Sequence, residues 1–203
     1  MTSPLTHPER VAVARLHALL ELLPTALDQR LAPAGVTSFE HTVLDVLADS
    51  PEQRARLSEV ARRTNASRPR LSRVAGALER RGLIERAACE LDGRATNAVL
   101  TERGAETLAR SRAAYAEAVR ELVLAGLAGL PGDGTAQLSE LSYAILTSLD
   151  PGAAAGAAGA ATAAAGATGA AAPEAAAAGT CPADRSRKDA ECAADPPQAA
   201  TAP

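Results

Sequence analysis

The chain has 203 residues, three cysteines, a formal net charge of −3 and 1% aromatic residues. This length allows one domain or two small ones, and three cysteines are too few for a disulfide framework. The sequence starts without a basic region followed by an apolar run, and no segment is long and apolar enough to span a bilayer, so we expect a cytoplasmic protein with no membrane part.

Composition divides the chain near residue 150. Residues 1–150 mix apolar, polar and charged side chains, which is typical of a folded domain. Residues 151–203 are rich in Ala, Gly and Pro and contain no Leu, Ile, Val, Phe, Met, Tyr or Trp. Because that segment has so little to bury against the entropy of ordering, we expect it to be a disordered tail.

A leucine stripe predicts the first helix, from about Glu9 to Leu31. The leucines recur every three or four residues, which places them on one helical face. Pro24 lies within the stripe, and we expect it to kink or restart the helix because proline lacks an amide hydrogen. An apolar face this long is usually covered by a partner, which indicates dimerisation.

Three further helices are predicted before residue 82. The capping box of Thr37 and Glu40 opens the first, and a short helix from about Ser58 to Arg63 follows. After a turn at Asn65-Ala66, Ser67 caps the third, which Gly82 ends in a left-handed conformation. The apolar face of this third helix consists of Leu71, Val74, Ala75 and Leu78.

A hairpin and two helices complete the predicted order. Short strands are expected at Leu83–Arg86 and Ala95–Leu100, joined by a turn at Asp92-Gly93. Thr101 caps a helix that runs to about Leu127, and a last helix covers about Thr135 to Leu149. The fold class is therefore mainly α with a small β-hairpin wing, a winged helix-turn-helix with flanking helices.

Positive charge gathers in one stretch of this acidic chain. Residues 54–86 hold ten arginines and three glutamates, a net charge of +7, whereas the whole chain carries −3. Such a basic patch is typical of a protein that binds a polyanion. An ordinary solvated surface of an Arg-rich protein would explain the choice of Arg over Lys but not its concentration in one place.

The helix after Ser67 is predicted to read double-stranded DNA. Burial of its apolar face leaves Arg68, Arg70, Ser72 and Arg73 toward solvent near its N-terminus. A helix fits the major groove, arginine can bind guanine or phosphate with two donors, and Ser67 and Ser72 can bind phosphate. We interpret Arg80, Arg81 and Arg86 as solvated or phosphate-adjacent side chains.

The sequence from Leu57 to Arg86 resembles the helix-turn-helix of the MarR family of bacterial regulators. The stretch LDGRATNAVLTERG (Leu91–Gly104) is similar to the wing of that family, and the resemblance extends over about residues 9–149. It implies a DNA-binding lobe at about 51–101 and dimerisation helices at about 9–33 and 102–149. It also implies a homodimer that binds a pseudo-palindromic operator, usually as a repressor released by a small-molecule effector or by thiol oxidation.

The same resemblance assigns roles in the wing and a site for an effector. Arg94 matches the wing arginine that enters the minor groove, and Asp92 matches the carboxylate that orients it. The effector pocket of the family would lie near four residues that can equally be ordinary core or surface. These are His17, Phe39, His41 and Tyr115.

Other functions find little support in the sequence. Cys89 lies in the wing, away from the N-terminal helices that carry reactive cysteines in redox-sensing relatives, and the histidines are not spaced as metal ligands. There is no phosphate-binding glycine loop and no nucleophile elbow, so we expect neither an enzyme nor a bound cofactor or metal. The alternative function is a winged helix used for protein–protein interaction without DNA binding.

Overall fold

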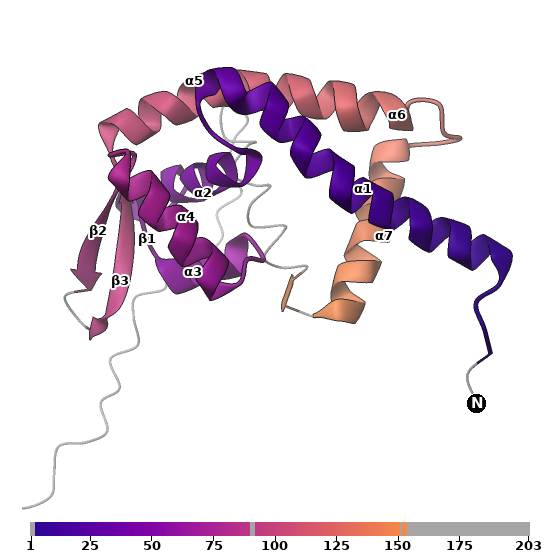
Figure 1. The fold of residues 1–203 in the computed structure, drawn as a ribbon, viewed down its shortest axis with the longest axis horizontal. Coiled ribbons are helices and arrows are strands. Elements are labelled where there is room, and N and C mark those ends of the chain that lie inside the picture. The colour runs from indigo at the N-terminus through magenta and orange to yellow at the C-terminus, as the bar shows by residue number, and fades with distance from the viewer. Residues whose placement is uncertain (1–2, 90–91, 151, 154–203) are drawn as a thin grey trace, which may run out of the picture. The chain divides into compact units, whose positions relative to one another are not determined.

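Seven α-helices and a three-stranded sheet form the part of the chain that the computed structural model describes, residues 3–89, 92–150 and 152–153, with the side chains of 88–95 excepted. The predicted tail at 151–203 lies almost wholly outside these residues. Figure 1 labels the elements: α1 (His7–Leu31), α2 (Ser38–Ala48), β1 (Arg54–Arg56), α3 (Leu57–Arg63), α4 (Arg68–Arg80), β2 (Ile84–Cys89), β3 (Asp92–Leu100), α5 (Glu102–Val119), α6 (Ala125–Leu127) and α7 (Gly134–Leu149). Short 3₁₀ turns lie at Ala32–Ala34 and Pro51–Gln53, and a π-helical turn at Arg120–Leu124 joins α5 to α6.

The predicted helix starts are confirmed by their capping hydrogen bonds. At α2, the Glu40 amide donates to Thr37 Oγ1 at 3.2 Å and the Thr37 amide donates to Glu40 Oε2 at 2.9 Å. Ser67 Oγ accepts from the Arg70 amide at the start of α4, and Thr101 Oγ1 accepts from the Gly104 amide at the start of α5. Each cap satisfies amides that have no partner within their own helix.

The end of α4 is also as predicted. Gly82 has φ +67°, a left-handed conformation that glycine adopts without steric cost. The Leu83 amide donates to Leu78 O at 3.0 Å and the Gly82 amide to Glu79 O at 2.8 Å, which satisfies the last carbonyls of the helix. Leu83 is thereby returned to the core, where it is buried.

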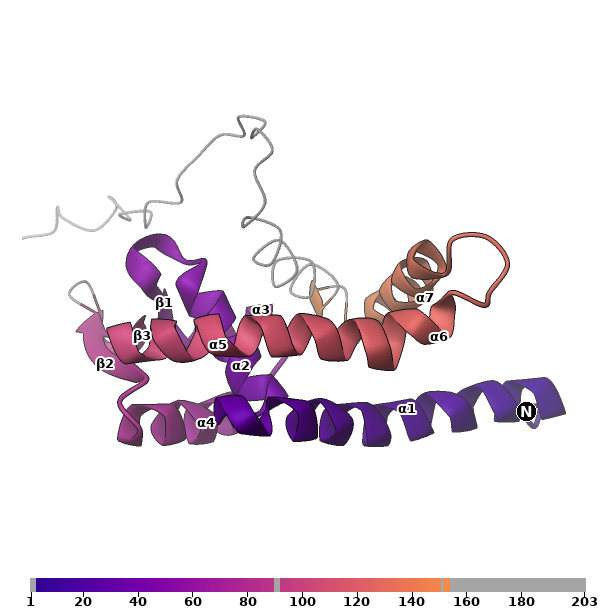
Figure 2. The same cartoon turned by 90° about the horizontal axis from the view of Figure 1, so that it is seen from above.

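The predicted restart of the first helix at Pro24 is not observed. α1 begins at His7 and continues through Pro24 to Leu31 as one helix of 25 residues. Proline removes one intrahelical hydrogen bond, and a helix this long retains the bonds on either side of it. Packing of the C-terminal end of α1 against α2 and α5 stabilises the helix beyond Pro24 (Figure 2).

The sheet differs from the predicted hairpin in two ways. It has three antiparallel strands in the order β1-β3-β2, and β1, with Arg54 opposite Val99, was not predicted. Asp92 and Gly93 lie in β3, with Asp92 paired to Cys89, so the predicted turn at Asp92-Gly93 is wrong. The connection between the strands is residues 90–91, which lie outside the described residues. The register at the buried end of the sheet, where Ile84 pairs with Leu100, continues as far as Ala88 opposite Thr96, and a shift between Ala88 and Cys89 then pairs Cys89 with Asp92.

The core lies where α2, α3, α4 and the sheet meet the start of α5. Its largest fully buried apolar side chains are Leu31, Val43, Leu44, Val46, Leu47, Val60, Leu71, Leu78 and Ile84. Burial of Leu71, Ala75 and Leu78 fixes the rotation of α4 about its own axis. The core therefore decides which α4 side chains face solvent.

Much of α1 and α7 contributes nothing to this core. α1 buries only Leu27 and Leu31, at its C-terminal end, and α7 buries only Gly134. Large apolar side chains are exposed along both helices and along the segment that joins α5 to α7, namely Val13, Leu19, Leu20, Leu22, Leu122, Leu130, Leu141, Tyr143, Ile145 and Leu149. We call this set the exposed apolar surface. None of the helices in the described part of the chain is both long and apolar enough to cross a membrane.

Candidate nucleic-acid interface

The solvent-facing side of α4 is divided into three stripes by helical periodicity. The outer stripe, opposite the buried face, contains Pro69, Arg73, Gly76 and Arg80 at steps of four, three and four residues. Arg73 and Arg80 are exposed. A Cβ at Gly76 would lie 3.5 Å from Arg86 Nη2 and 3.6 Å from Arg80 Nη1, so two guanidinium groups flank this glycine. The outer stripe is positively charged along most of its length.

A second stripe of α4 faces the start of α2. It contains Arg70, Val74, Ala77 and Arg81, again at helical spacing. Arg81 Nη1 donates to Glu40 Oε1 at 3.0 Å, and its Nη2 donates to the Gly35 carbonyl. Arg70 therefore lies on the flank of α4 and not at the centre of its outer face.

The third stripe faces β2, and an ion pair joins it to that strand. Arg86 Nε lies 3.1 Å from Glu79 Oε2, and Arg86 Nη2 donates to the Ser72 carbonyl at 3.2 Å. Arg68 and the Ser72 side chain lie on this flank and are exposed. The structure thus places the predicted residues Arg68, Arg70, Ser72 and Arg73 on one helix but in three different stripes.

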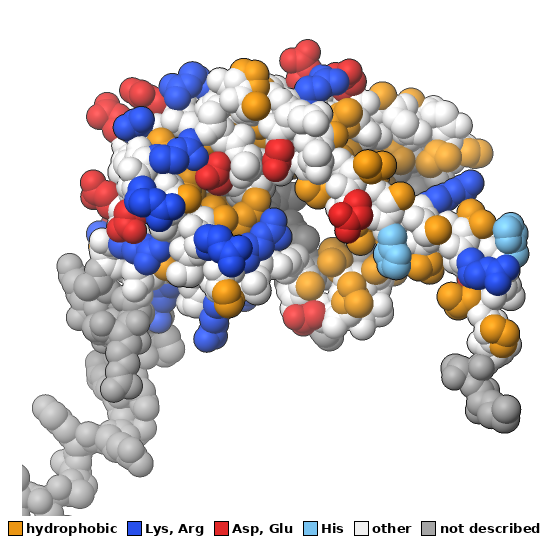
Figure 3. All heavy atoms as spheres, in the orientation of Figure 1, with side chains coloured by type: hydrophobic (Ala, Val, Ile, Leu, Met, Phe, Trp, Pro, Cys, Tyr) orange, Lys and Arg blue, Asp and Glu red, His pale blue; other side chains and the backbone are white. Residues whose placement is uncertain are grey.

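Ion pairs separate the four arginines of α4 from the other arginines between Arg62 and Arg86. Arg62, Arg81, Arg86 and Arg112 form salt bridges with glutamate or aspartate, as do Arg30 and Arg63. Arg68, Arg70, Arg73 and Arg80 form neither a hydrogen bond nor an ion pair with a side chain that the structure describes. Figure 3 shows basic side chains gathered over the region of α3 and α4. Unpaired arginines on one exposed helix are available to an anionic partner.

The wing residues were the other half of the predicted interface. The backbone of Asp92 and Arg94 lies in β3, but their side chains are outside the described residues, as is that of Cys89. Their roles therefore stay predictions.

The residues expected near an effector do not all meet. The rings of His41 and Tyr115 stack with centroids 4.4 Å apart, and His41 Nδ1 lies 2.8 Å from the buried Ser111 Oγ. Phe39 instead contacts Arg70, whose Cζ is 4.1 Å from the ring centroid, and His17 is exposed on α1. His41 is thus part of the packing between α2 and α5, and it is one of the few buried polar side chains.

Burial of His41 predicts a pH-dependent stability. Burial lowers the pKa of His41 from its ordinary value of 6.5, Arg112 lowers this pKa further, and Asp45 opposes the shift. Below pH 6.5 the unfolded chain consequently binds more protons than the folded chain, so the free energy of unfolding should fall as the pH drops through the window between the two pKa values. One proton limits the slope to about 1.4 kcal/mol per pH unit.

Urea unfolding at about pH 7.5 and about pH 5.5, on either side of the ordinary histidine pKa, measures this effect. His41→Gln, which retains a polar group but does not titrate, should reduce the difference between the two pH values. His17→Gln, at an exposed histidine on α1, should leave the difference as in the wild type. An equal pH difference in His41→Gln and wild type would show that His41 is not responsible.

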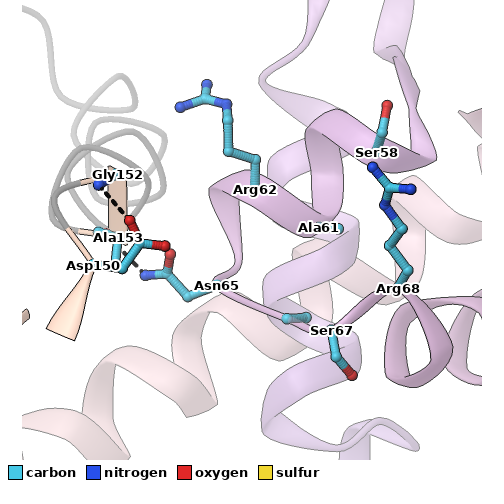
Figure 4. A pocket seen from close by; sticks show the side chains of 10 residues that line it. Ser58, Ala61, Arg62, Asn65, Ser67, Arg68, Asp150, Gly152 and Ala153 are labelled. Carbon is cyan, nitrogen blue, oxygen red and sulfur yellow. Dashed lines mark hydrogen bonds between the residues drawn. The ribbon is translucent and has the colours of Figure 1, made fainter.

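A surface pocket of about 500 Å³ lies at the helix-turn-helix, and His41 is not among the residues that line it (Figure 4). Its walls come from α3, from the turn at Asn65 and the start of α4, and from Asp150, Gly152 and Ala153. Asn65, which has φ +50°, donates from Nδ2 to the Ala153 carbonyl at 2.9 Å. Among the described residues, no cluster of three or more His, Cys, Asp or Glu side chains could hold a metal ion.

Fold and site together define a winged helix-turn-helix protein: α3 and α4 joined by a tight turn, an arginine-bearing face on α4, and a β-sheet wing. The family model described as "MarR family" matches residues 34–95. Among solved structures, Sco3205 from Streptomyces coelicolor, a MarR family transcriptional regulator in complex with DNA, is 30% identical with a TM-score of 0.69, covering 74% of this chain and 93% of that one. AbsC from the same organism, also a MarR family transcriptional regulator, is 30% identical with a TM-score of 0.66, covering 73% and 98%.

The chain belongs to the MarR family of transcriptional regulators, which confirms the predicted family and fold class. PcaV from Streptomyces coelicolor, a transcriptional regulator in complex with its natural ligand, is 25% identical with a TM-score of 0.54, covering 71% of this chain and 96% of that one. No curated protein sequence matches the chain.

Proposed function

We propose that this protein is a homodimeric, cytoplasmic transcriptional repressor that binds a pseudo-palindromic operator and is released by a small-molecule effector. The observation that carries the proposal is the set of unpaired arginines Arg68, Arg70, Arg73 and Arg80 on α4. A helix with this surface fits the major groove and neutralises phosphates. We expect Ser67, Ser72, Asp92 and Arg94 to complete the contact, and we expect no catalytic activity.

Two protomers are needed for such a site. The exposed apolar surface carries ten large apolar side chains on α1, on α7 and on the residues that join α5 to α7, and exposed apolar patches of this kind mark interaction sites. A second copy of the chain would cover it symmetrically and would set two α4 helices about one turn of DNA apart. We therefore assign residues 9–33 and 102–149 to dimerisation and about 51–101 to DNA binding.

The likeness to Sco3205 and PcaV supports the two partners of the proposal. Sco3205 was solved in complex with DNA and PcaV with its natural ligand. The competing function, a winged helix for protein–protein interaction, predicts an apolar or acidic face on α4. The arginines found on that face favour DNA.

A salt titration of DNA binding tests the proposal. The full chain is titrated against a labelled duplex from its own promoter region at a series of salt concentrations. With about six to eight phosphate contacts per dimer, the log of the association constant should fall with the log of salt at a slope of about −5 to −7. The complex should contain two chains per duplex.

The matched variant is Arg70→Ala/Arg73→Ala, which should lose most of the affinity while retaining the fold. Both side chains are exposed, so their removal opens no cavity. A slope near zero would contradict binding through phosphates. Folded wild-type protein that fails to bind at low salt would favour the interaction module.

A further inference from the structure

The ring of Phe39 and the guanidinium of Arg70 form a contact between α2 and the recognition helix α4. Arg70 Cζ lies 4.1 Å from the ring centroid, within the range of a cation–π interaction. Phe39 is half-buried and packs against the core, whereas Arg70 is exposed. Arg70 has no other polar contact with a side chain in the described ranges, so the ring is what orients this guanidinium.

The position of the ring is itself fixed. Phe39 lies inside the Thr37–Glu40 capping box, which holds the first turn of α2. Ser38 adds two bonds, because its amide and its hydroxyl each donate to Asp28 Oδ1 at 2.6 Å. Arg81 ties the same end of α2 to the C-terminal end of α4 through Glu40. The turn of α2 that carries the ring is thereby held in place beside α4.

A guanidinium that lies over an aromatic ring keeps available the N–H donors that point away from the ring, because its five donors are spread around its edge. These donors match the oxygens of a phosphate. Arg70 also lies on the α2 flank of α4, away from the outer stripe with Arg73. When a helix occupies the major groove, its flanks are beside the phosphate strands and its outer face is toward the base edges.

We propose that Phe39 is a positioning residue that presents Arg70 to a phosphate of the DNA backbone. The inference rests on the proposed DNA-binding function and gives Arg70 a different task from Arg73. The Arg70 contact is independent of base sequence, and Phe39 strengthens it by restricting a side chain that would otherwise have to be ordered on binding. Arg73 is left to read bases.

A double-mutant cycle with Phe39→Leu and Arg70→Ala tests the proposal in the full chain, by titration of promoter and unrelated duplexes. Leucine retains an apolar side chain against the core but has no π face. Phe39→Leu should weaken binding to both duplexes about equally, by roughly 5- to 30-fold for the two sites of a dimer. In the Arg70→Ala background the same change should have almost no effect, since the contact is already absent.

Phe39→Tyr, which keeps the ring, should bind like the wild type. Arg70→Ala should also reduce the steepness of the salt dependence by about one phosphate per protomer. Thermal unfolding of every variant separates loss of fold from loss of positioning. If Phe39→Leu is less stable and weakens binding equally in the wild-type and Arg70→Ala backgrounds, the ring only supports the fold. That result would overturn the inference.

The remaining outcomes are also decisive. If the wild type binds DNA and Phe39→Leu binds as tightly, the inference is wrong while the proposed function stands. If Arg70→Ala lowers the affinity for the promoter duplex alone, Arg70 reads bases and the phosphate assignment is wrong. If the folded wild type binds neither duplex, the proposed function fails, and this inference fails with it.

Discussion

Replacement of Arg73 by alanine is expected to abolish most of the preference for operator DNA over unrelated DNA. Arg73 is exposed in the outer stripe of α4 and has no ion pair with a described side chain, so its donors are available to guanine. A bidentate contact of this kind discriminates by about 1–3 kcal/mol, and a dimer makes two. We expect the affinity for the operator to fall about 30-fold or more, with a much smaller loss on unrelated DNA. Competition between the two duplexes measures the ratio.

The matched control removes the same charge elsewhere. Arg110 is exposed on α5, and its side chain bonds only to Thr107 Oγ1, one turn earlier, among the described residues. Arg110→Ala should leave the specificity ratio unchanged, because it alters the net charge without touching α4. Arg73 does not read bases if Arg73→Ala and Arg110→Ala reduce the affinity for the operator equally. The same conclusion follows if Arg73→Ala reduces the affinity for operator and unrelated DNA by the same factor.

Replacement of Gly104 by alanine is expected to destabilise the fold more than the same replacement at any other glycine that the structure describes. Gly104 is buried in the first turn of α5, and a Cβ there would lie 2.0 Å from Leu83 O and 2.7 Å from Leu100 Cδ1. The first of these is a backbone atom that also accepts from the Thr101 amide, so it cannot move without separating α5 from the sheet. We expect a loss of about 3 kcal/mol, or a fall in Tm of about 6–12 °C.

Gly126 supplies the control for this change. It lies in α6, and a Cβ there would have no heavy atom within 4 Å in the described part of the chain. Gly126→Ala should leave the Tm unchanged or raise it slightly, because alanine favours a helix over glycine. Thermal unfolding followed by circular dichroism compares the two variants. A Gly104→Ala protein that unfolds at the wild-type temperature would show that α5 packs less closely against Leu83 than the structure indicates.

Much of the fold was predictable because its determinants are local. The caps Thr37, Ser67 and Thr101 bond to amides three residues away, and Gly82 adopts its left-handed conformation within one turn of α4. Interactions over so short a range leave a pattern in consecutive residues. The apolar periodicity of α4 likewise indicated its buried face before any neighbour was known.

Three features escaped prediction because distant segments decide them. β1 (Arg54–Arg56) has only three residues, too few for a recognisable strand pattern, and it is a strand because β3 offers it hydrogen bonds. Asp92-Gly93 has the composition of a turn, yet a register shift between Ala88 and Cys89 pairs Asp92 with Cys89 and places it in β3. α1 continues through Pro24 to an end that is packed against other helices.

For the candidate interface, the sequence by itself determined the family resemblance, the concentration of arginine between residues 54 and 86, and which helix would carry it. Only the tertiary structure divided those arginines into paired and unpaired ones and assigned Arg70 to the flank beside Phe39, apart from Arg73. The physical reason is that helical spacing specifies which side chains share a face of α4. What each face meets depends on how α2 and β2 pack around it, through contacts such as those of Arg81 with Glu40 and Arg86 with Glu79.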